Sequence, residues 1–149
     1  MEDNYFASVG AIVLRNDEVL LVRHTYGDAI GKLLNPSGYM RHGEMPYDAL
    51  KREVLEETGI EIAPKGLLTV RCSEKDWWLV FLADYVSGTP RSDGHENSEA
   101  LFMPCDEATY HPDVTSAVKI LLELAKKEKL LTPNEDYARV LSKYGVMFS

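Results

Sequence analysis

The spacing of apolar residues predicts several short strands, most of them in the first two-thirds of the chain. Residues 7–14 form an apolar run, a polar turn covers 15–18, and a second apolar run covers 19–22. Apolar runs of this length between turn residues are typical of strands, so we expect these two to form a hairpin. Further strand candidates are residues 33–34, 60–62, 67–72, 77–86 and 101–103.

Other stretches have the periodicity of helices. Residues 46–58 begin with proline, whose missing N–H costs no hydrogen bond in a first helical turn, and glycine follows at the expected end. Residues 115–129 carry apolar residues at helical spacing and predict an amphipathic helix packed on the sheet: Val118, Leu121, Leu122 and Ala125. Residues 134–144 predict a further short helix, and residues 25–38 are expected to be mostly loop.

Length and composition favour one globular domain. The 149 residues are 45% hydrophobic and 27% charged, without repeats or a linker, so residues 1–149 are expected to form a single α/β domain with mixed strands. The net charge of −8 argues against a partner that is a nucleic-acid polymer, because proteins that follow such polymers gather Lys and Arg. A small anionic substrate fits, since a bound cation reverses the local field.

Neither the cysteines nor the N-terminus indicate a special environment. Cys72 and Cys105 are far apart, which predicts reduced thiols and neither a zinc site nor a disulfide framework. The acidic residues 1–4 and the short apolar run after them, broken by Ser8 and Gly10, resemble neither a signal peptide nor a membrane span. We therefore expect a cytoplasmic protein without a membrane partner.

Three glutamates of the first predicted helix form an acidic cluster. Glu53, Glu56 and Glu57 stand at i, i+3 and i+4, so they share one face with Cβ atoms about 5–6 Å apart. Lys51 and Arg52 are expected to point elsewhere, which leaves water and salt, or a divalent cation, to balance the charge. One interpretation is a solvated acidic face. The other is a metal site, favoured because the cluster borders the apolar stripe of the helix.

The segment before this helix supports the metal site. Gly38 and Gly43 allow a tight turn that brings a backbone carbonyl close to a ligand. Carboxylate and carbonyl oxygens are the ligands that Mg²⁺ prefers, and it completes its shell with water and phosphate. Such a site suits cleavage of a diphosphate, because the metal neutralises phosphate oxygens and activates water.

The whole segment resembles a known motif. It reads Gly38-x5-Glu44-x7-Arg52-Glu53-Val54-x-Glu56-Glu57-x-Gly59-Ile60. This pattern looks like a complete Nudix box over residues 38–60, the motif of the Nudix (MutT-like) hydrolases. The resemblance extends over roughly residues 5–130 and implies the fold of that family, an α/β/α sandwich with a mixed central sheet.

The resemblance also implies roles for these residues. Glu53, Glu56 and Glu57 would bind Mg²⁺ or Mn²⁺, with a backbone carbonyl of Ser37 or Gly38 as a further ligand. Arg52 would orient the carboxylates, and Glu44 would hold the loop against the helix. Family members often add an acidic residue from a loop before a later strand: Glu99 is the first choice and Glu96 the reserve. The catalytic base is Glu53 or Glu99, with Glu53 preferred.

The sequence indicates the residues that contact the substrate less specifically than the metal ligands. Arg23, after the second predicted strand, and Arg41 are candidates for phosphate contacts, with surface charges as the alternative. Tyr39 is a candidate for contact with a base or ribose, as are Trp77, Trp78 and Tyr85. In a strand Trp77 and Trp78 face opposite sides, so at most one of them lines a given pocket.

The resemblance implies a metal-dependent hydrolase that cleaves a diphosphate linkage in a nucleoside diphosphate joined to another moiety. Nucleotide sugars, ADP-ribose and nucleoside triphosphates are substrates of this type. The alternative is a Nudix-fold binding or sensing module without catalysis, which the intact carboxylates disfavour. A homodimer is compatible with the family analogy.

Overall fold

A central sheet of seven strands organises the molecule, and the computed structural model describes residues 6–149 of the chain. The acidic start, residues 1–4, lies outside the described residues. The strand order is β3-β2-β1-β6-β5, while β4 pairs with β1 and β7 pairs with β2. The strands are β1 (Ala7–Arg15), β2 (Glu18–His24), β3 (Leu33–Leu34), β4 (Ser37–Tyr39), β5 (Glu61–Cys72), β6 (Trp77–Ser87) and β7 (Asn97–Pro104).

Strand β1 is the centre of this arrangement, and it makes the sheet mixed. It runs parallel to β6 over its whole length, from the pair Ala7–Trp77 to the pair Leu14–Asp84. It is antiparallel to β2 and β4. The predicted hairpin of β1 and β2 is confirmed, but only the ends next to the turn pair, and residues 8–10 of β1 pair with β4 instead.

The pleat of β1 sends alternate side chains to opposite faces of the sheet, and each face is covered by a helix. Helix α1 (Pro46–Thr58) buries Ala49, Leu50 and Val54 against one face. The β1 residues on this face are Val9, Ala11 and Val13. Helix α1 begins at its proline as predicted, and it ends at Gly59, which adopts a left-handed backbone (φ 75°) and donates its N–H to Leu55.

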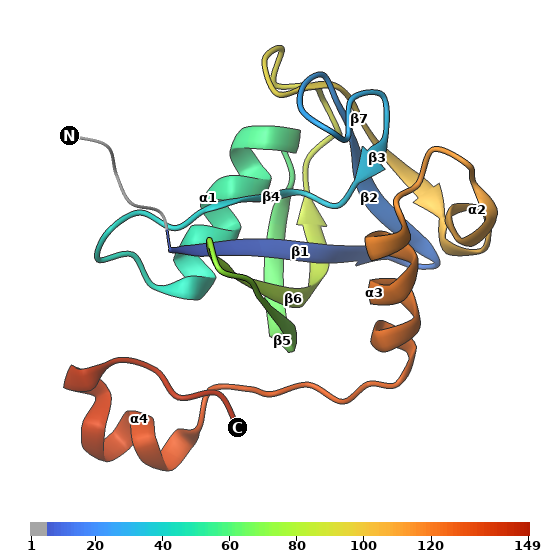
Figure 1. The fold of residues 1–149 in the computed structure, drawn as a ribbon. Helices are drawn as coiled ribbons and strands as arrows, with labels where there is room; N and C mark the ends of the chain where they lie inside the picture. The colour runs from blue at the N-terminus through green and yellow to red at the C-terminus, as the bar shows by residue number, and fades with distance from the viewer. Residues whose placement is uncertain (1–5) are drawn as a thin grey trace.

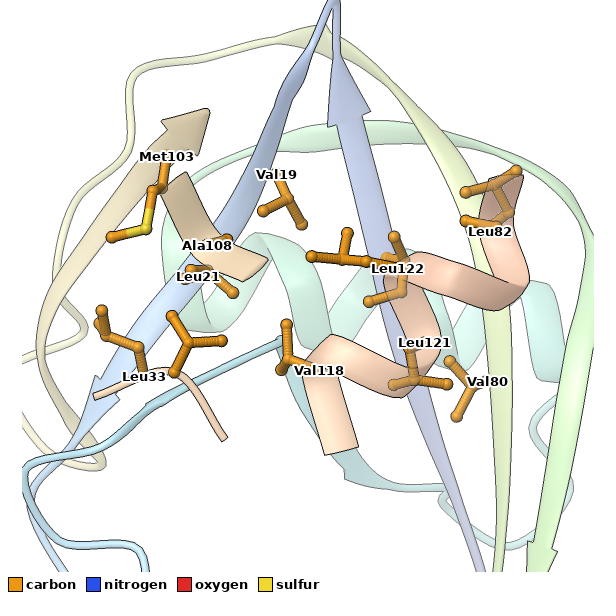
Figure 2. Close-up of a cluster of buried hydrophobic side chains, with 13 residues drawn as sticks. Val19, Leu21, Leu33, Val80, Leu82, Met103, Ala108, Val118, Leu121 and Leu122 are labelled. Atoms are coloured by element: carbon orange, nitrogen blue, oxygen red, sulfur yellow. The ribbon is translucent and has the colours of Figure 1, made fainter. Parts of the chain in front are cut away.

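Helix α3 (Ser116–Lys126) covers the other face. Thr115 caps it by accepting a hydrogen bond from the Val118 N–H. Figure 2 shows Val118, Leu121 and Leu122 directed at side chains of the sheet, among them Val19, Leu21, Val80 and Leu82. The two helices with the sheet between them form the expected α/β/α sandwich, and the predicted mixed sheet is confirmed (Figure 1).

Several elements differ from the sequence-based expectation because strand pairing extends or adds them. Residues 61–72 form one strand, β5, with a register shift between Pro64 and Gly66, where proline cannot donate a ladder hydrogen bond. Strand β4 lies in the segment expected to be loop, paired with β1. Strand β7 begins at Asn97, and α2 (Cys105–Tyr110) was not expected.

The predicted C-terminal helix is present as α4 (Glu135–Leu141), followed by the 3-10 turn η1 (Ser142–Tyr144). It stands apart from the sheet in Figure 1 and buries none of its residues. The chain then returns, and Phe148 packs against Tyr47 and Phe81 beside α1. Among residues 6–149, no helix is long and apolar enough to cross a bilayer.

Candidate functional site

A cavity of about 480 Å³ lies where β4, α1, α3 and the loop before β7 meet. One group of side chains on its wall is acidic and consists of Glu53, Glu57 and Glu96. A second group contains Asn35, Arg71, Asp76 and Trp78. Volumes of 300–1,000 Å³ are usual for ligand pockets, so this one has room for a nucleotide-sized molecule.

Glu57 is a buried carboxylate on the cavity wall. Its exposed fraction is only 7%, and its Oε2 accepts a hydrogen bond of 3.1 Å from the backbone N–H of Ser37. Burial, together with repulsion from Glu53, raises the pKa of Glu57 to about 9. A carboxyl in this environment favours binding of a cation, because a positive charge would offset both the burial and the repulsion.

Glu53 lies one helical turn before Glu57 and directly against Gly38. A Cβ atom at position 38 would overlap the Glu53 carboxylate, so the glycine of β4 makes the close approach of strand and helix possible. Burial raises the pKa of Glu53, and a hydrogen bond from Arg52 partly opposes this shift. Ser37, Gly38 and Tyr39 line the cavity beside it.

Arg52 does not point away from the acidic cluster, so that expectation was wrong. Its guanidinium contacts Glu44 at 2.7 Å, Glu53 at 2.7 Å and Glu56 at 3.3 Å. The side chain is drawn across its own helix because Glu44, from the loop, binds both Nε and Nη2 of Arg52. These hydrogen bonds lower the pKa of Glu44 to about 2. The loop is thereby clamped to the helix.

Glu56 and Arg41 are exposed and are not among the residues that line the cavity. The Glu56 side chain is 53% exposed and contacts Arg52 and, at 3.6 Å, Arg41. The Arg41 side chain is 66% exposed, and its backbone N–H binds Glu44. The helix thus directs two of its three clustered carboxylates into the cavity and the third toward solvent.

Glu99 does not precede a strand, which corrects the expectation about the later loop. Because β7 begins at Asn97, Glu99 lies inside it and pairs with Arg23 of β2. Arg23 belongs to β2 and binds Asp113 at 2.9 Å, with Glu99 at 3.9 Å, so neither residue lines the cavity. The loop position just before the strand is held by Glu96, which does line the cavity.

Asn97 connects the loop of Glu96 to the helix of Glu57, and no pattern in the sequence indicated this role. Its side chain is 2% exposed. Nδ2 donates to the backbone carbonyl of Glu57 at 3.0 Å, and Oδ1 accepts from the Asp93 N–H at 3.2 Å. The carbonyl belongs to the last turn of α1, where a helix leaves carbonyls without internal partners. Asn97 therefore sets the position of the loop carboxylate relative to the helix.

Two pocket residues were outside the predicted site or only weakly indicated. Trp78 lines the cavity and Trp77 does not, in agreement with the predicted alternation. Asn35 stands three residues before the first glycine of the box. Its side chain is 3% exposed, although asparagine is usually a surface residue, and only the folded structure reveals this burial.

The acidic wall fits a divalent cation. All of its donors are oxygen atoms, which Mg²⁺ and Mn²⁺ accept, and the raised pKa of Glu57 reflects burial and repulsion from Glu53, both of which a cation would offset. Within residues 6–149, no three Asp, Glu, His or Cys side chains are already close enough together to enclose a metal. A cation would therefore have to draw Glu53, Glu57 and Glu96 together.

Comparisons of the sequence give a consistent family. A family model for the NUDIX domain matches residues 4–124. The 8-oxo-dGDP phosphatase of Danio rerio is 34% identical over 95 residues, which cover 62% of this chain and 29% of that protein. The NAD-capped RNA hydrolase NudC of Actinobacillus succinogenes is 29% identical over 127 residues, covering 76% and 46%. The chain thus spans less than half the length of these relatives.

Solved structures agree with the sequence comparisons. A NUDIX hydrolase from Nitrosomonas europaea is 30% identical with a TM-score of 0.69, covering 84% of this chain and 90% of that chain. A NUDIX family hydrolase from Clostridium perfringens has a TM-score of 0.72 at 16% identity, covering 85% and 99%, and shares the fold. With the family model spanning most of the sequence, and Gly38, Glu53 and Glu57 of the box on the wall of one cavity, the chain belongs to the Nudix family.

Proposed function

We propose that the protein is a hydrolase that uses Mg²⁺ or Mn²⁺ to cleave a diphosphate linkage in a nucleoside diphosphate joined to another moiety. Nucleotide sugars, ADP-ribose and nucleoside triphosphates belong to this class. The observation that carries the proposal is the pair Glu53 and Glu57, two carboxylates on the wall of a cavity large enough for a nucleotide. Arg52 contacts Glu53 at 2.7 Å, whereas no ion pair within residues 6–149 involves Glu57.

The proposed metal ligands are Glu53 and Glu57 from α1 and Glu96 from the loop, with the exposed Glu56 added. A backbone carbonyl of Ser37 or Gly38 would be the remaining metal ligand that the protein supplies. A cation held there would neutralise phosphate oxygens and lower the pKa of a bound water. Arg52 is a positioning residue, because it fixes the Glu53 carboxylate while Glu44 fixes Arg52.

The remaining steps follow from the side chains. A water oxygen attacks phosphorus and forms a new P–O bond, the bridging P–O bond breaks, and the departing phosphate keeps its electron pair. Glu53, on the cavity wall, is the proposed acceptor of the water proton. Asn97 and the Arg52–Glu44 pair hold the two acidic segments in place and touch no reacting atom.

The names of the relatives support a phosphoric anhydride as the bond that is cut. They are an 8-oxo-dGDP phosphatase and an NAD-capped RNA hydrolase, and the substrates in both names contain a diphosphate. The second name includes a polymer, so a capped RNA belongs in any substrate panel. The proposed substrate of this chain is the small nucleotide.

The test is a panel of candidate substrates assayed for phosphate-containing products. It contains ADP-ribose, sugar nucleotides, dinucleoside polyphosphates, normal and oxidised nucleoside di- and triphosphates, and NAD-capped RNA. We expect hydrolysis of at least one member with Mg²⁺ or Mn²⁺ and none with EDTA. Activity that persists in EDTA would refute the metal, and metal-dependent binding without turnover of any member would indicate a sensing module instead.

A matched pair of variants tests the loop ligand. Glu96→Gln should lower kcat and weaken Mn²⁺ binding about tenfold or more, while Glu99→Gln should change both little, since Glu99 faces Arg23 instead of the cavity. Glu123→Gln, on the exposed surface of α3, is the control. The opposite ranking of Glu96 and Glu99 would return the role to Glu99.

A further inference from the structure

The wall of the cavity that the proposed hydrolysis does not use is built around Trp78. The indole lies across β1 at Gly10: its Nε1 and Cε2 are 2.6 and 2.9 Å from where a Cβ on Gly10 would stand. The Ser37 side chain lies 2.8 Å from the same point. Trp78 therefore meets Ser37 over Gly10, and Ser37 in turn binds Glu57, so the aromatic and acidic walls are neighbours.

An ion pair fixes the surroundings of the indole. The guanidinium carbon of Arg71 is 5.8 Å from the centre of the Trp78 ring, and Asp76 accepts a hydrogen bond of 2.9 Å from Arg71. Asp76 also binds the hydroxyl of Ser73. An aromatic surface held in one orientation before a ligand arrives loses less conformational freedom on binding.

Asn35 is a largely buried amide that makes one long hydrogen bond. Its side chain is 3% exposed, and Nδ2 reaches only the carbonyl of the adjacent Pro36, at 3.4 Å. Within residues 6–149, no donor bonds Oδ1, and Asn35 lines the cavity. Since no fully buried side-chain oxygen or nitrogen among the described residues lacks a partner, Oδ1 remains in contact with the cavity that Asn35 lines, where it can accept a hydrogen bond from a ligand.

We propose that this wall is a base subsite, in which a purine stacks on Trp78 while its edge bonds to the Asn35 amide. The inference rests on the proposed function, in that the phosphates of the same molecule lie at Glu53 and Glu57. A purine covers more of an indole than a pyrimidine does. Adenine and guanine both carry a donor and an acceptor side by side, and an amide can bind such an edge at two points.

The fluorescence of Trp78 tests the subsite without any catalysis. Trp77 lies outside the cavity, with 47% exposure and its ring against Phe6, so Trp77→Phe leaves Trp78 as the reporter. We expect AMP or GMP, titrated without metal, to quench it at a concentration at least about tenfold lower than UMP. Ribose 5-phosphate should not quench. In the converse variant Trp78→Phe, no nucleotide should quench the remaining Trp77.

Substitutions of Asn35 separate recognition from folding. In the Trp77→Phe background, Asn35→Leu keeps the shape of the side chain and should raise the purine Kd about tenfold. Asn35→Asp keeps the size and one acceptor but removes the donor, and it should weaken purine binding as well. Ribose 5-phosphate binding, measured by calorimetry with Mg²⁺, should be unchanged in both. Should Asn35→Leu unfold, Asn35→Asp gives the same test.

These experiments distinguish a failure of the base subsite from a failure of the proposed hydrolysis. Equal quenching by UMP and the purines, or an unchanged purine Kd in the Asn35 variants, would overturn the subsite. Purine-selective quenching in a protein that hydrolyses no member of the substrate panel would leave the subsite standing and refute the proposed hydrolysis. Hydrolysis of panel members without purine-selective quenching would overturn the subsite and leave the proposed hydrolysis standing.

Discussion

Two carboxylates of the box segment are both mostly shielded from solvent, yet they are opposite in character. The Glu44 side chain is 15% exposed and Glu57 is 7% exposed. Two hydrogen bonds from Arg52 lower the pKa of Glu44 to about 2, whereas burial and repulsion from Glu53 raise that of Glu57 to about 9. The difference is the deeper burial of Glu57 and the guanidinium at Glu44. The first region is a clamp that holds the loop, and the second is a carboxyl that a cation would bind by displacing its proton.

The largest expected effect comes from removing the charge of Glu57. Glu57→Gln should lower kcat at least about a hundredfold, because a carboxamide is a poor ligand for Mg²⁺. The same change should raise the melting temperature in EDTA near neutral pH, since it removes the cost of keeping Glu57 protonated in the folded protein. Activity assays and thermal melts with and without Mg²⁺ measure both. Full activity, with the usual stabilisation by Mg²⁺, would show that Glu57 is not a ligand.

A substitution in the clamp should lower stability, in contrast to Glu57→Gln. Arg52→Gln leaves Glu44 and Glu53 without their common partner, and we expect a loss of about 2–4 kcal/mol in the free energy of unfolding. Adding Glu44→Gln to this variant should recover part of the loss, because it removes one stranded charge. Urea unfolding of the single and double variants measures the coupling. Additive losses would mean that the ion pair contributes no specific stability.

The pH dependence of stability distinguishes the two carboxylates directly. Above about pH 4.5, the unfolded chain releases the Glu57 proton while the folded protein retains it, so the free energy of unfolding falls as the pH rises toward 9. The Glu44 contribution has the other sign: it is present above pH 4.5 and is lost as the pH falls toward 2.

The measurement is the melting temperature in EDTA of the native protein and Glu57→Gln. Between pH 5 and 9, the melting temperature of the native protein should fall by at least about 4 °C more than that of the variant. This difference is equivalent to about 2 kcal/mol at this chain length. Subtracting the two curves removes the contribution of other groups. If the difference in melting temperature between the two proteins did not change with pH, this would contradict the raised pKa of Glu57.

The smallest effect is expected at Asn97, which joins the loop to the helix. Asn97→Asp keeps the acceptor for the Asp93 N–H but loses the donor to the Glu57 carbonyl. We expect Mn²⁺ affinity to fall about tenfold, in the range usual for residues that position metal ligands. Calorimetric titration with Mn²⁺ measures it, and the exposed Ser98→Ala is the control. Unchanged affinity would make Asn97 a purely structural residue.

Much of the fold could be predicted because its signals are local. The bounds of α1 follow from Pro46 and Gly59, and the apolar spacing of α3 follows from its packing on one face. Strand β4 and the start of β7 could not be predicted, since their hydrogen bonds come from β1 and β2, far away in the sequence. The misplacement of Glu99 follows from this, because the start of β7 decides which glutamate is the last loop residue.

The sequence by itself determined which carboxylates stand on one helix and that a glycine precedes them, because helical spacing and the box pattern are written in consecutive residues. Tertiary structure alone decided their charge states. Arg52 reaches Glu44 only when the loop folds back, and Glu57 is buried only when β4 lies over α1. The desolvation of a carboxylate and its distance from a counter-charge depend on the packing of separate segments, so the chemistry of the pocket is a property of the fold.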